Sequence, residues 1–478
     1  MQFQRNKRKS INPTRYIVLG FGAIILLGTL LLHLPISAQN GQVTPWLTCL
    51  FTATSATCVT GLILVDTAVH WSVFGQAVIL LLLQLGGLGF VTLISIIPFA
   101  LHRRIGLSQR LMMASAMNLD RVAGVVRVVR HALLGTLLVE GAGAVLLAIR
   151  FVPQFGWTGI WFSIFHSVSA FCNGGFDILG LYSGPYSSLA AYQGDPLVLC
   201  TIMALIVIGG LGFFVWEDLI QKRCWKKLTL YSKMVLGITA CLIFFGGVYF
   251  TCAEWDNPAT LGSMPLWQRP LNALFQSVTL RTAGYATFDQ GGLLDGSAVM
   301  SILLMLIGGS SGSTAGGLKT VTVGILLLAL RDGLRGREQV VFRGRRIPGP
   351  KVLDAMTLTL TVVLLFLSAS MLLSLMERVP YVQAAFETAS AMGTVGVTMG
   401  ITPGLSAPSA LLIILLMFLG RVGILSFSIA FLTRGRGGEQ DSLSRHRRYG
   451  GLTRGGSHEE LFDRRAGAVW HRAGTGIV

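Results

Sequence analysis

Charge is scarce in this sequence. Only 12% of its 478 residues are charged, whereas 52% are hydrophobic. The seven cysteines are scattered without a C-x-x-C pair, so the sequence lacks the spacing of a disulfide framework or of a cysteine metal site. No H-E-x-x-H or Walker pattern occurs, and we expect neither enzyme activity nor a covalent cofactor. These absences argue against a soluble enzyme and favour a protein that lies in a membrane.

Eight apolar runs, almost free of charge, account for the high hydrophobic content. They are Tyr16–Leu32, Ser72–Leu101, Ala132–Ala148, Leu197–Trp216, Met234–Phe250, Val299–Leu330, Val352–Met376 and Ala407–Leu432. Each is long enough to cross a hydrocarbon core of roughly 30 Å as a helix. The predicted fold class is therefore an all-α integral membrane protein with eight transmembrane helices. The first run is too long for a signal peptide and is expected to remain as an anchor.

Basic residues are concentrated in alternate linkers between these runs. They precede the first run and recur within 102–131, 222–233 and 331–351. The other linkers, 34–71, 151–196, 251–296 and 378–408, hold three arginines against eight acids. Because basic loops stay on the cytoplasmic side of a membrane, both termini are predicted to be cytoplasmic. This placement explains the net charge of +17 without a nucleic-acid partner.

A short motif recurs once in each of the linkers that are poor in basic residues. Its copies are SATCVTG at Ser55–Gly61, SAFCNGG at Ser169–Gly175, VTLRTAG at Val278–Gly284 and SAMGTVG at Ser390–Gly396. Their last glycines are separated by 114, 109 and 112 residues, and each copy is preceded by a phenylalanine, Phe51, Phe165, Phe275 or Phe386. A regular period of this kind marks an internal repeat. Each unit is predicted to hold a span, a short outer helix, an extended stretch ending in glycine, and a second span.

The outer helices are predicted to enter the membrane and turn back. They cover Pro45–Thr57, Gly156–Phe171, Leu266–Leu280 and Tyr381–Met392, which are too short to cross it. Non-helical backbone is tolerated at membrane depth only where it lines a cavity or is buried in protein. Four such stretches around one axis would line a pore, where rings of carbonyl oxygens can replace the hydration shell of a cation such as K⁺. The candidate filter residues are Cys58, Val59, Thr60, Gly61, Cys172, Asn173, Gly174, Gly175, Arg281, Thr282, Ala283, Gly284, Gly393, Thr394, Val395 and Gly396. The alternative is that these motifs only pack helices together.

Two features inside the predicted spans suggest a second constriction. The stretch GGSSGSTAGGLKT, Gly308–Thr320, holds five glycines and cannot form a stable continuous helix, since each costs about 1 kcal/mol relative to alanine. Arg421 lies inside the last run, where an arginine is costly and usually functional. We expect both features to face the pore. The candidate residues are Gly308, Gly309, Ser310, Ser311, Gly312, Ser313, Thr314, Ala315, Gly316, Gly317, Lys319 and Arg421. A glycine-rich kink and a structural ion pair are the alternatives.

The loops FTATSATCVTGL, FHSVSAFCNGGFD, FQSVTLRTAGY and FETASAMGTVGV resemble the four filter loops of the Trk/Ktr/HKT superfamily. The nearest resemblance is to the KtrB-type (TrkH-like) potassium uptake subunits of bacteria, and it covers roughly residues 12–435. It implies four membrane–pore-loop–membrane units around one pore, with filter glycines at Gly61, Gly175, Gly284 and Gly396. It also implies that the Gly308–Thr320 loop gates conduction and that Arg421 is a cation barrier there. Glycine in the first loop marks the potassium-permeable members, so Gly61 favours K⁺.

The resemblance also implies partners. They are a cytoplasmic KtrA/TrkA-type ring that binds ATP or ADP, a second copy of the chain in a homodimer, membrane lipid, and Na⁺ as an activator, all at a bacterial plasma membrane. A Na⁺-conducting or weakly selective member is one alternative. A secondary cation symporter is another, although its repeats would normally be inverted. A receptor or scaffold would not need four filter loops.

The predicted units are 1–131, 132–232, 233–351 and 352–433, and the third contains the loop 308–320. Residues 434–478 form a basic tail without apolar periodicity, beyond the point where superfamily members end. This tail is expected to be disordered or out of frame. The codons of His458–Ala473 can encode, in another frame, a start codon and a G-x-G-x-x-G fingerprint.

Several polar residues lie near the predicted filter. The carboxylates that follow filter glycines are Asp66, Asp177 and Asp289, which either draw cations to the pore mouth or are ordinary solvated loop residues. Arg281 and Glu387 are expected to brace the filter. His166 is expected to be a hydrogen-bonded residue of the second outer helix rather than a ligand. The glycine pairs Gly86-Gly87 and Gly209-Gly210 are expected to permit close helix packing.

Overall fold

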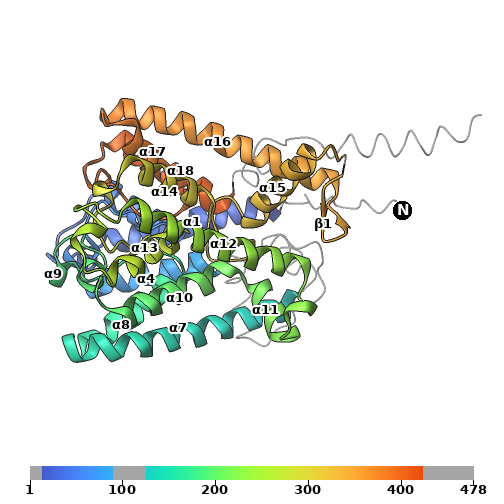
Figure 1. Ribbon diagram of the computed structural model, residues 1–478. Coiled ribbons are helices and arrows are strands. Elements are labelled where there is room, and N and C mark those ends of the chain that lie inside the picture. Colours follow the sequence, from blue (N-terminus) through green and yellow to red (C-terminus); the bar gives the residue numbers. More distant parts are fainter. Residues whose placement is uncertain (1–12, 90–124, 338, 424–478) are drawn as a thin grey trace, which may run out of the picture. The chain divides into compact units, whose positions relative to one another are not determined.

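The computed structural model describes residues 13–89, 125–337 and 339–423, and these residues are predominantly helical (Figure 1). The α-helices are α1 (Pro13–His33), α2 (Trp46–Cys58), α3 (Thr67–His70), α4 (Val73–Leu88), α7 (Val125–Phe155), α8 (Thr158–Phe171), α9 (Gly180–Ser183), α10 (Pro196–Leu211), α11 (Phe213–Lys222), α12 (Leu230–Ala253), α13 (Gln268–Thr279), α14 (Asp295–Leu306), α15 (Thr320–Leu334), α16 (Gly349–Glu377), α17 (Tyr381–Gly393) and α18 (Ala407–Val422). The 3-10 turns are η1 (Pro35–Ser37), η2 (Ala190–Tyr192), η3 (Trp225–Lys227), η4 (Leu261–Ser263), η5 (Gln290–Gly292) and η6 (Thr402–Gly404). One antiparallel hairpin joins β1 (Val341–Phe342) to β2 (Arg345–Arg346).

Within the described residues each of the eight apolar runs contains helix, but not every one forms a single long helix. Within the described residues, three helices are long and apolar enough to cross a membrane, namely Arg130–Phe155 of α7, Leu230–Ala253 and Gly349–Glu377. Shorter apolar helices cover Val18–His33, Val73–Leu88, Asp295–Leu306 and Ala407–Val422. The long helices expose leucines outward, such as Leu138 on α7 and Leu375 on α16, as lipid-facing surfaces do.

The run Leu197–Trp216 is not the single straight helix that its composition suggests. It is divided into α10 and α11, which meet at an angle of 93°. The bend occurs at Gly212, whose φ of 90° is open to glycine and strained for other residues. The carbonyls that α10 would use to continue are occupied by another segment, since Gly209 accepts from the Thr314 amide (3.4 Å) and Gly210 from the Ser310 amide (3.2 Å). Tertiary hydrogen bonds therefore end this helix early.

The packing of the helices repeats four times. The first helix of each unit packs against the short helix that follows it, in the pairs α1–α2, α7–α8, α12–α13 and α16–α17. Each short helix also packs against the second helix of another unit, in the pairs α4–α8, α10–α13, α14–α17 and α18–α2. The second set of contacts returns from the last unit to the first. The four units thus form a closed cycle of contacts.

The short helices α2, α8, α13 and α17 lie at the centre of this arrangement. Their motif phenylalanines, Phe51, Phe165, Phe275 and Phe386, are each completely buried. Burial of a phenylalanine side chain contributes about 2 kcal/mol or more, so these residues are principal anchors of the short helices. The phenylalanine of the repeated sequence motif is therefore a packing residue.

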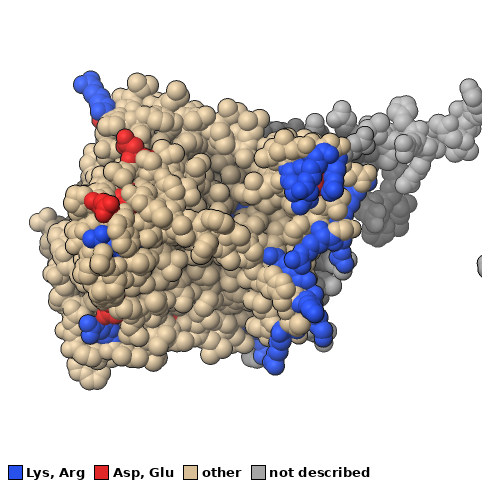
Figure 2. Space-filling view, viewed as in Figure 1, with Lys and Arg blue, Asp and Glu red and all other residues tan. Residues whose placement is uncertain are grey.

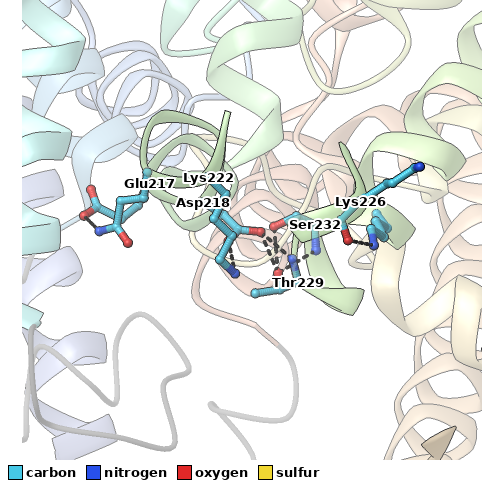
Figure 3. A network of polar contacts seen from close by, with 8 residues as sticks. Glu217, Asp218, Lys222, Lys226, Thr229 and Ser232 are labelled. Atoms are coloured by element: carbon cyan, nitrogen blue, oxygen red, sulfur yellow. Dashed lines mark hydrogen bonds and ion pairs between the residues drawn. The ribbon is translucent and has the colours of Figure 1, made fainter. Parts of the chain in front are cut away.

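Exposed basic side chains gather at one end of the described structure. Figure 2 shows Lys and Arg concentrated at the end that carries α11 and β1 in Figure 1. The α11–α12 turn at this end is fixed by Asp218, which accepts hydrogen bonds from the amide and hydroxyl of Thr229 (both 2.8 Å) and pairs with Lys222 at 2.7 Å (Figure 3). The hairpin is fixed in a similar way, since Asp332 accepts from the Val341 amide at 2.9 Å. The predictions for residues 90–124 and for the tail 434–478 lie outside the described residues.

Candidate functional site

The four repeated motifs have one backbone conformation. Each begins at the C-terminal end of a short helix, where a non-glycine residue adopts positive φ: Val59 (58°), Asn173 (60°), Thr282 (69°) and Thr394 (52°). Two residues later comes the predicted filter glycine, also at positive φ: Gly61 (95°), Gly175 (66°), Gly284 (90°) and Gly396 (98°). Left-handed conformations are uncommon for residues with a Cβ and rare for β-branched ones such as valine and threonine. Their recurrence at matched positions shows that the repeat extends to local geometry.

The four glycines meet in a ring. A Cβ atom added at Gly61 would lie 2.7 Å from the Gly174 carbonyl oxygen, and one added at Gly175 would lie 2.7 Å from the Ala283 oxygen. One added at Gly284 would lie 2.5 Å from the Val395 oxygen, and one added at Gly396 would overlap the Thr60 oxygen. Each glycine therefore faces the carbonyl that precedes the glycine of the next loop, and the fourth loop returns to the first. Any side chain at these positions would collide with backbone.

A hydroxyl residue near the start of each motif holds the loop. The Ser55 hydroxyl accepts the Gly61 amide and the Ser390 hydroxyl accepts the Gly396 amide, both at 3.0 Å. In the other two loops the hydroxyl is the donor, from Ser169 to the Phe176 carbonyl (2.8 Å) and from Thr279 to the Tyr285 carbonyl (2.6 Å). Sequence reasoning included these residues in the motifs without giving them a role. A hydroxyl residue recurs five or six residues before each glycine, and this recurrence was the signal that could have identified them.

The polar residues Glu387, Arg281 and His166 have different environments. Glu387 accepts hydrogen bonds from the Met399 amide (3.0 Å) and from the hydroxyls of Thr398 and Thr402, so it holds the chain that follows the fourth loop. Arg281 is buried, but its Nε has no hydrogen-bond partner among the described residues. His166 is buried and its Nδ1 lies 2.8 Å from the Phe162 carbonyl, which agrees with a packing role.

The carboxylates beyond the glycines do not behave alike. Asp66 is buried and accepts the amides of Ala68 and Val69 (both 2.9 Å) and of Tyr186 (2.8 Å), so it is not a solvated loop residue. It joins the loop after Gly61 to the loop after Gly175. Asp289 is exposed and caps η5 through the Gly291 amide (2.9 Å). Asp177 is partly buried and accepts the Leu179 amide (3.3 Å).

The glycine-rich stretch between α14 and α15 is a compact loop, and the helix break expected there is present. α14 ends at Leu306 and α15 starts at Thr320. Besides its bonds to α10, the loop donates from the Thr314 hydroxyl to the Phe171 carbonyl (3.3 Å), at the end of α8. A Cβ at Gly316 would overlap the Thr394 side chain of the fourth motif. This segment therefore packs directly against the second and fourth motif loops.

Two cationic side chains contact carbonyls of this region. Arg421 of α18 donates to the Thr314 carbonyl in the glycine-rich loop and to the Gly86 and Gly87 carbonyls at the end of α4. Lys319 donates to the Ala315 carbonyl at 2.8 Å. Within the described residues neither has a carboxylate in ion-pair distance. Arg421 thus connects three segments through backbone carbonyls, which differs from the structural ion pair considered as an alternative.

The glycine pairs at the helix ends allow this close packing. A Cβ at Gly86 would overlap the Thr57 carbonyl, and one at Gly209 would overlap the Phe171 carbonyl. A Cβ at Gly87 would lie 2.7 Å from the Cys172 sulfur. The expected role is therefore confirmed for Gly86, Gly87 and Gly209, whereas a Cβ at Gly210 would make only an ordinary contact, 3.5 Å from Asn173 Nδ2.

The fold and the ring of carbonyls define a helical, multi-pass membrane protein whose central loops present backbone oxygens to one another. Residues 5–435 match the model of the TrkH family, described as a cation transport protein, and the chain belongs to this family. The resemblance of the loops to Trk/Ktr membrane subunits of the KtrB type is thereby confirmed.

Individual relatives agree with this assignment. The chain is 42% identical to the potassium/sodium uptake protein NtpJ of Enterococcus hirae, with 90% of this chain and 95% of that protein covered. It is 39% identical to the Ktr system potassium uptake protein B of Bacillus subtilis, with 88% and 93% covered. The crystal structure of the potassium transporter TrkH from Vibrio parahaemolyticus has the same fold, with a TM-score of 0.69 at 17% identity over 90% of this chain and 86% of that one.

Proposed function

We propose that the chain is the potassium-translocating membrane subunit of a Ktr/Trk-type uptake system. The observation that carries the proposal is the closed ring in which Gly61, Gly175, Gly284 and Gly396 each face a carbonyl of the neighbouring loop. Such a ring offers oxygens in place of the water around a dehydrating cation. The C-terminal ends of α2, α8, α13 and α17 carry partial negative charge and adjoin the ring, which favours a cation over an anion.

The filter in this proposal consists of the four residues that end each motif. Their carbonyls would bind K⁺ in transit, and K⁺ is the substrate rather than a resident cofactor. The names of the relatives in E. hirae and B. subtilis support potassium as the transported ion. The E. hirae name also includes sodium, so a less selective or Na⁺-conducting protein is the second candidate. Stimulation by Na⁺ belongs to the proposal through the resemblance of the loops.

The gate in this proposal is the loop Gly308–Thr320 together with Arg421. Thr314 and Gly316 of this loop contact the second and fourth motif loops, and Arg421 joins the loop to α4 through the Thr314 and Gly86 carbonyls. A guanidinium at this position would repel a cation, and the barrier would fall when the loop moves away. Lys319 adds a second positive charge at the end of the loop.

The basic end of the molecule is proposed to face the cytoplasm. Exposed Arg223, Lys226 and Lys227 follow α11, and exposed Arg343 and Arg345 belong to the β1–β2 hairpin. Basic loops remain on the cytoplasmic side of a membrane. A nucleotide-binding KtrA/TrkA-type ring would dock there, the chain would pair as a homodimer, and lipid would surround it in a bacterial plasma membrane. The Ktr system names of relatives support a component of a multi-subunit system.

Uptake of K⁺ by a potassium-uptake-deficient strain tests the proposal. The chain is expressed with a KtrA-type partner, with and without Na⁺, as wild type, Gly61→Ser and Gly41→Ser. Gly41 has positive φ (71°) but open space around it, so it controls for backbone strain. We expect wild type and Gly41→Ser to restore growth at low K⁺, and Gly61→Ser to lose most discrimination between K⁺ and Na⁺. Full discrimination in Gly61→Ser would mean that this loop is not the filter, and a symporter would then be the better hypothesis.

A further inference from the structure

Glu140 is a buried acid in the middle of α7, one of the three helices long enough to cross the membrane. It is the one charged residue in the apolar run Ala132–Ala148. A carboxyl group at membrane depth is costly to bury, and such residues are usually retained for function. Within the described residues Glu140 forms no ion pair. Its hydrogen bonds therefore indicate what the carboxyl does.

Those hydrogen bonds lead to the second filter loop. The Gln84 side-chain amide of α4 donates to Glu140 Oε2 at 3.1 Å. The Cys172 thiol donates to Gln84 Oε1 at 3.4 Å and lies 3.8 Å from Glu140 Oε1. In addition, the Ser167 hydroxyl of α8 donates to the Glu140 backbone carbonyl at 2.6 Å. One acid thus connects α7, α4 and the loop that ends at Gly175.

The same contacts reach the segment that Arg421 binds. Gln84 lies one helical turn before Gly87 on α4, and Gly87 packs against the Cys172 sulfur. The Gly87 carbonyl is one of the acceptors of Arg421. The positions that correspond to Cys172 in the other loops are Cys58, Arg281 and Gly393, and the structure shows no carboxyl hydrogen-bonded to their side chains among the described residues. The second loop therefore has a support that the other loops lack.

We propose that Glu140 is a positioning residue for the second filter loop. Its carboxyl fixes the Gln84 amide, and the two side chains together hold the Cys172 thiol and, through it, the Gly174 carbonyl in the ring. This inference rests on the proposed function, because it assumes that the ring selects the ion. Without the carboxyl the second loop can relax inward toward a smaller cation, so discrimination between K⁺ and Na⁺ falls.

The test compares Glu140→Ala and Glu140→Gln in the full-length chain, co-expressed with a KtrA-type partner in the potassium-uptake-deficient strain. The measured quantity is inhibition of K⁺ uptake by Na⁺, together with the melting temperature of the purified protein. Glu140→Ala is expected to reduce discrimination about tenfold, the fold-change that corresponds to one buried hydrogen bond of ordinary strength. Glu140→Gln keeps an acceptor oxygen and is expected to stay within about twofold of wild type.

Glu254→Ala is the matched control. Glu254 is fully buried and accepts from the Asn257 amide (2.6 Å), the Thr260 hydroxyl (2.6 Å) and the Leu294 amide (3.1 Å), but it does not contact a filter loop. Its replacement is expected to lower the melting temperature and leave discrimination unchanged. If Glu254→Ala and Glu140→Ala reduce discrimination equally, the effect is general destabilisation and the inference is wrong.

Other outcomes also decide the question. Unchanged discrimination in a folded Glu140→Ala protein overturns the inference, and so does an equal loss in Glu140→Gln, which would mean that the charge acts on the ion directly. If Glu140→Ala does not fold, Cys172→Ala removes the same loop contact. Wild-type discrimination in that variant would also overturn the inference. Gly175→Ala serves as the reference for the proposed function. If transport and discrimination tolerate Gly175→Ala, the filter assignment fails and the inference fails with it, whereas loss in Gly175→Ala beside unchanged discrimination in Glu140→Ala overturns the inference alone.

Discussion

The four motif loops and the four helix ends that follow them in the sequence belong to the same repeat but differ in how alike their copies are. The loops share positive φ at two matched positions and one pattern of glycine against carbonyl. The helix ends read GGLG at 86–89, GGLG at 209–212, GGSS at 308–311 and GRVG at 420–423. Three of them place glycine at the second position, and the fourth places Arg421 there. The comparison teaches that the four loops keep one geometry, because each glycine packs against a carbonyl of its neighbour, whereas the four helix ends are free to differ and only the fourth carries a charge.

The contacts of these helix ends support the comparison. Gly86, Gly209 and Gly420 each press against the last carbonyls of the short helix in their own unit, at Thr57, Phe171 and Met392. Gly308, in the third unit, packs instead against Gly316 of the glycine-rich loop. In the third unit the helix end therefore contacts the glycine-rich loop, which is also the loop that Arg421 binds.

The largest effect is expected from Gly175→Ala, which tests the equivalence of the ring. The new Cβ would lie 2.7 Å from the Ala283 oxygen and 2.7 Å from the Gly284 Cα, so the ring has to distort. We expect K⁺ uptake to fall about a hundredfold or more, since backbone crowding and positive φ together cost several kcal/mol. Gly400→Ala is the control, because Gly400 has a φ of 92° but open space. Near-normal uptake in Gly175→Ala would show that the loops are not equivalent.

The next effect is expected from Arg421→Gln, which makes the fourth helix end neutral like the other three. The substitution removes charge-assisted hydrogen bonds to the Thr314 and Gly86 carbonyls. Such bonds contribute about 1.5–3 kcal/mol, so K⁺ leak without the cytoplasmic partner should rise about ten- to a hundredfold. Flux into proteoliposomes that contain the chain alone measures this leak. Lys319→Gln is the companion variant, and a larger leak from it than from Arg421→Gln would place the main barrier at Lys319.

Much of the architecture was predictable from the sequence, because the same motif recurs four times at nearly regular intervals. The expected outer helix Tyr381–Met392 agrees with α17 to one residue, and the break at Gly308–Thr320 is present because glycines disfavour helix. The bend after Leu211 was not predictable, since it depends on hydrogen bonds from residues a hundred positions away. Glu140 was missed for a similar reason: a single acid in an apolar run acquires a meaning only when Gln84 and Cys172 are brought next to it.

A smaller effect is expected from Glu387→Gln, which compares the supports of the third and fourth loops. In the third unit Gln276 and Gln290 form a pair of amides, with Nε2 of Gln290 3.2 Å from Oε1 of Gln276. Glu387 instead accepts three hydrogen bonds, and the side-chain amide of a glutamine at this position would place its NH₂ group against one of the three donors. The loss should be about 1–3 kcal/mol of stability, seen as a lower melting temperature in detergent. The opposite exchange, Gln276→Glu, should also destabilise, and a neutral result for both would mean that neither support matters.

The last comparison sets Ser55→Ala beside Ser169→Ala, which is expected to have the smallest effect of all. It distinguishes loops whose hydroxyl accepts a hydrogen bond from loops whose hydroxyl donates one. Ser55 accepts the buried Gly61 amide, and its loss leaves that amide without a partner at a cost of about 1–3 kcal/mol. Ser169→Ala removes only a donor to the Phe176 carbonyl and should cost about 1 kcal/mol. Thermal unfolding of the two purified variants gives the difference. A greater loss from Ser169→Ala would reverse the assignment of accepting hydroxyls as the stronger clamps.

The ring of glycines is built from one polypeptide, and this has a consequence for inheritance. A channel assembled from identical subunits receives any mutation four times, so a small change in a filter residue is multiplied around the whole axis. Here a substitution at Gly61 or Gly396 is introduced only once, and its strain falls first on one neighbouring loop, at the Gly174 or the Thr60 carbonyl. The four loops can therefore differ in sequence, as they do three residues before each glycine, where the chain has Cys58, Cys172, Arg281 and Gly393. In a ring made by one chain, a substitution can therefore change one loop while the matched residues of the other three loops stay as they are.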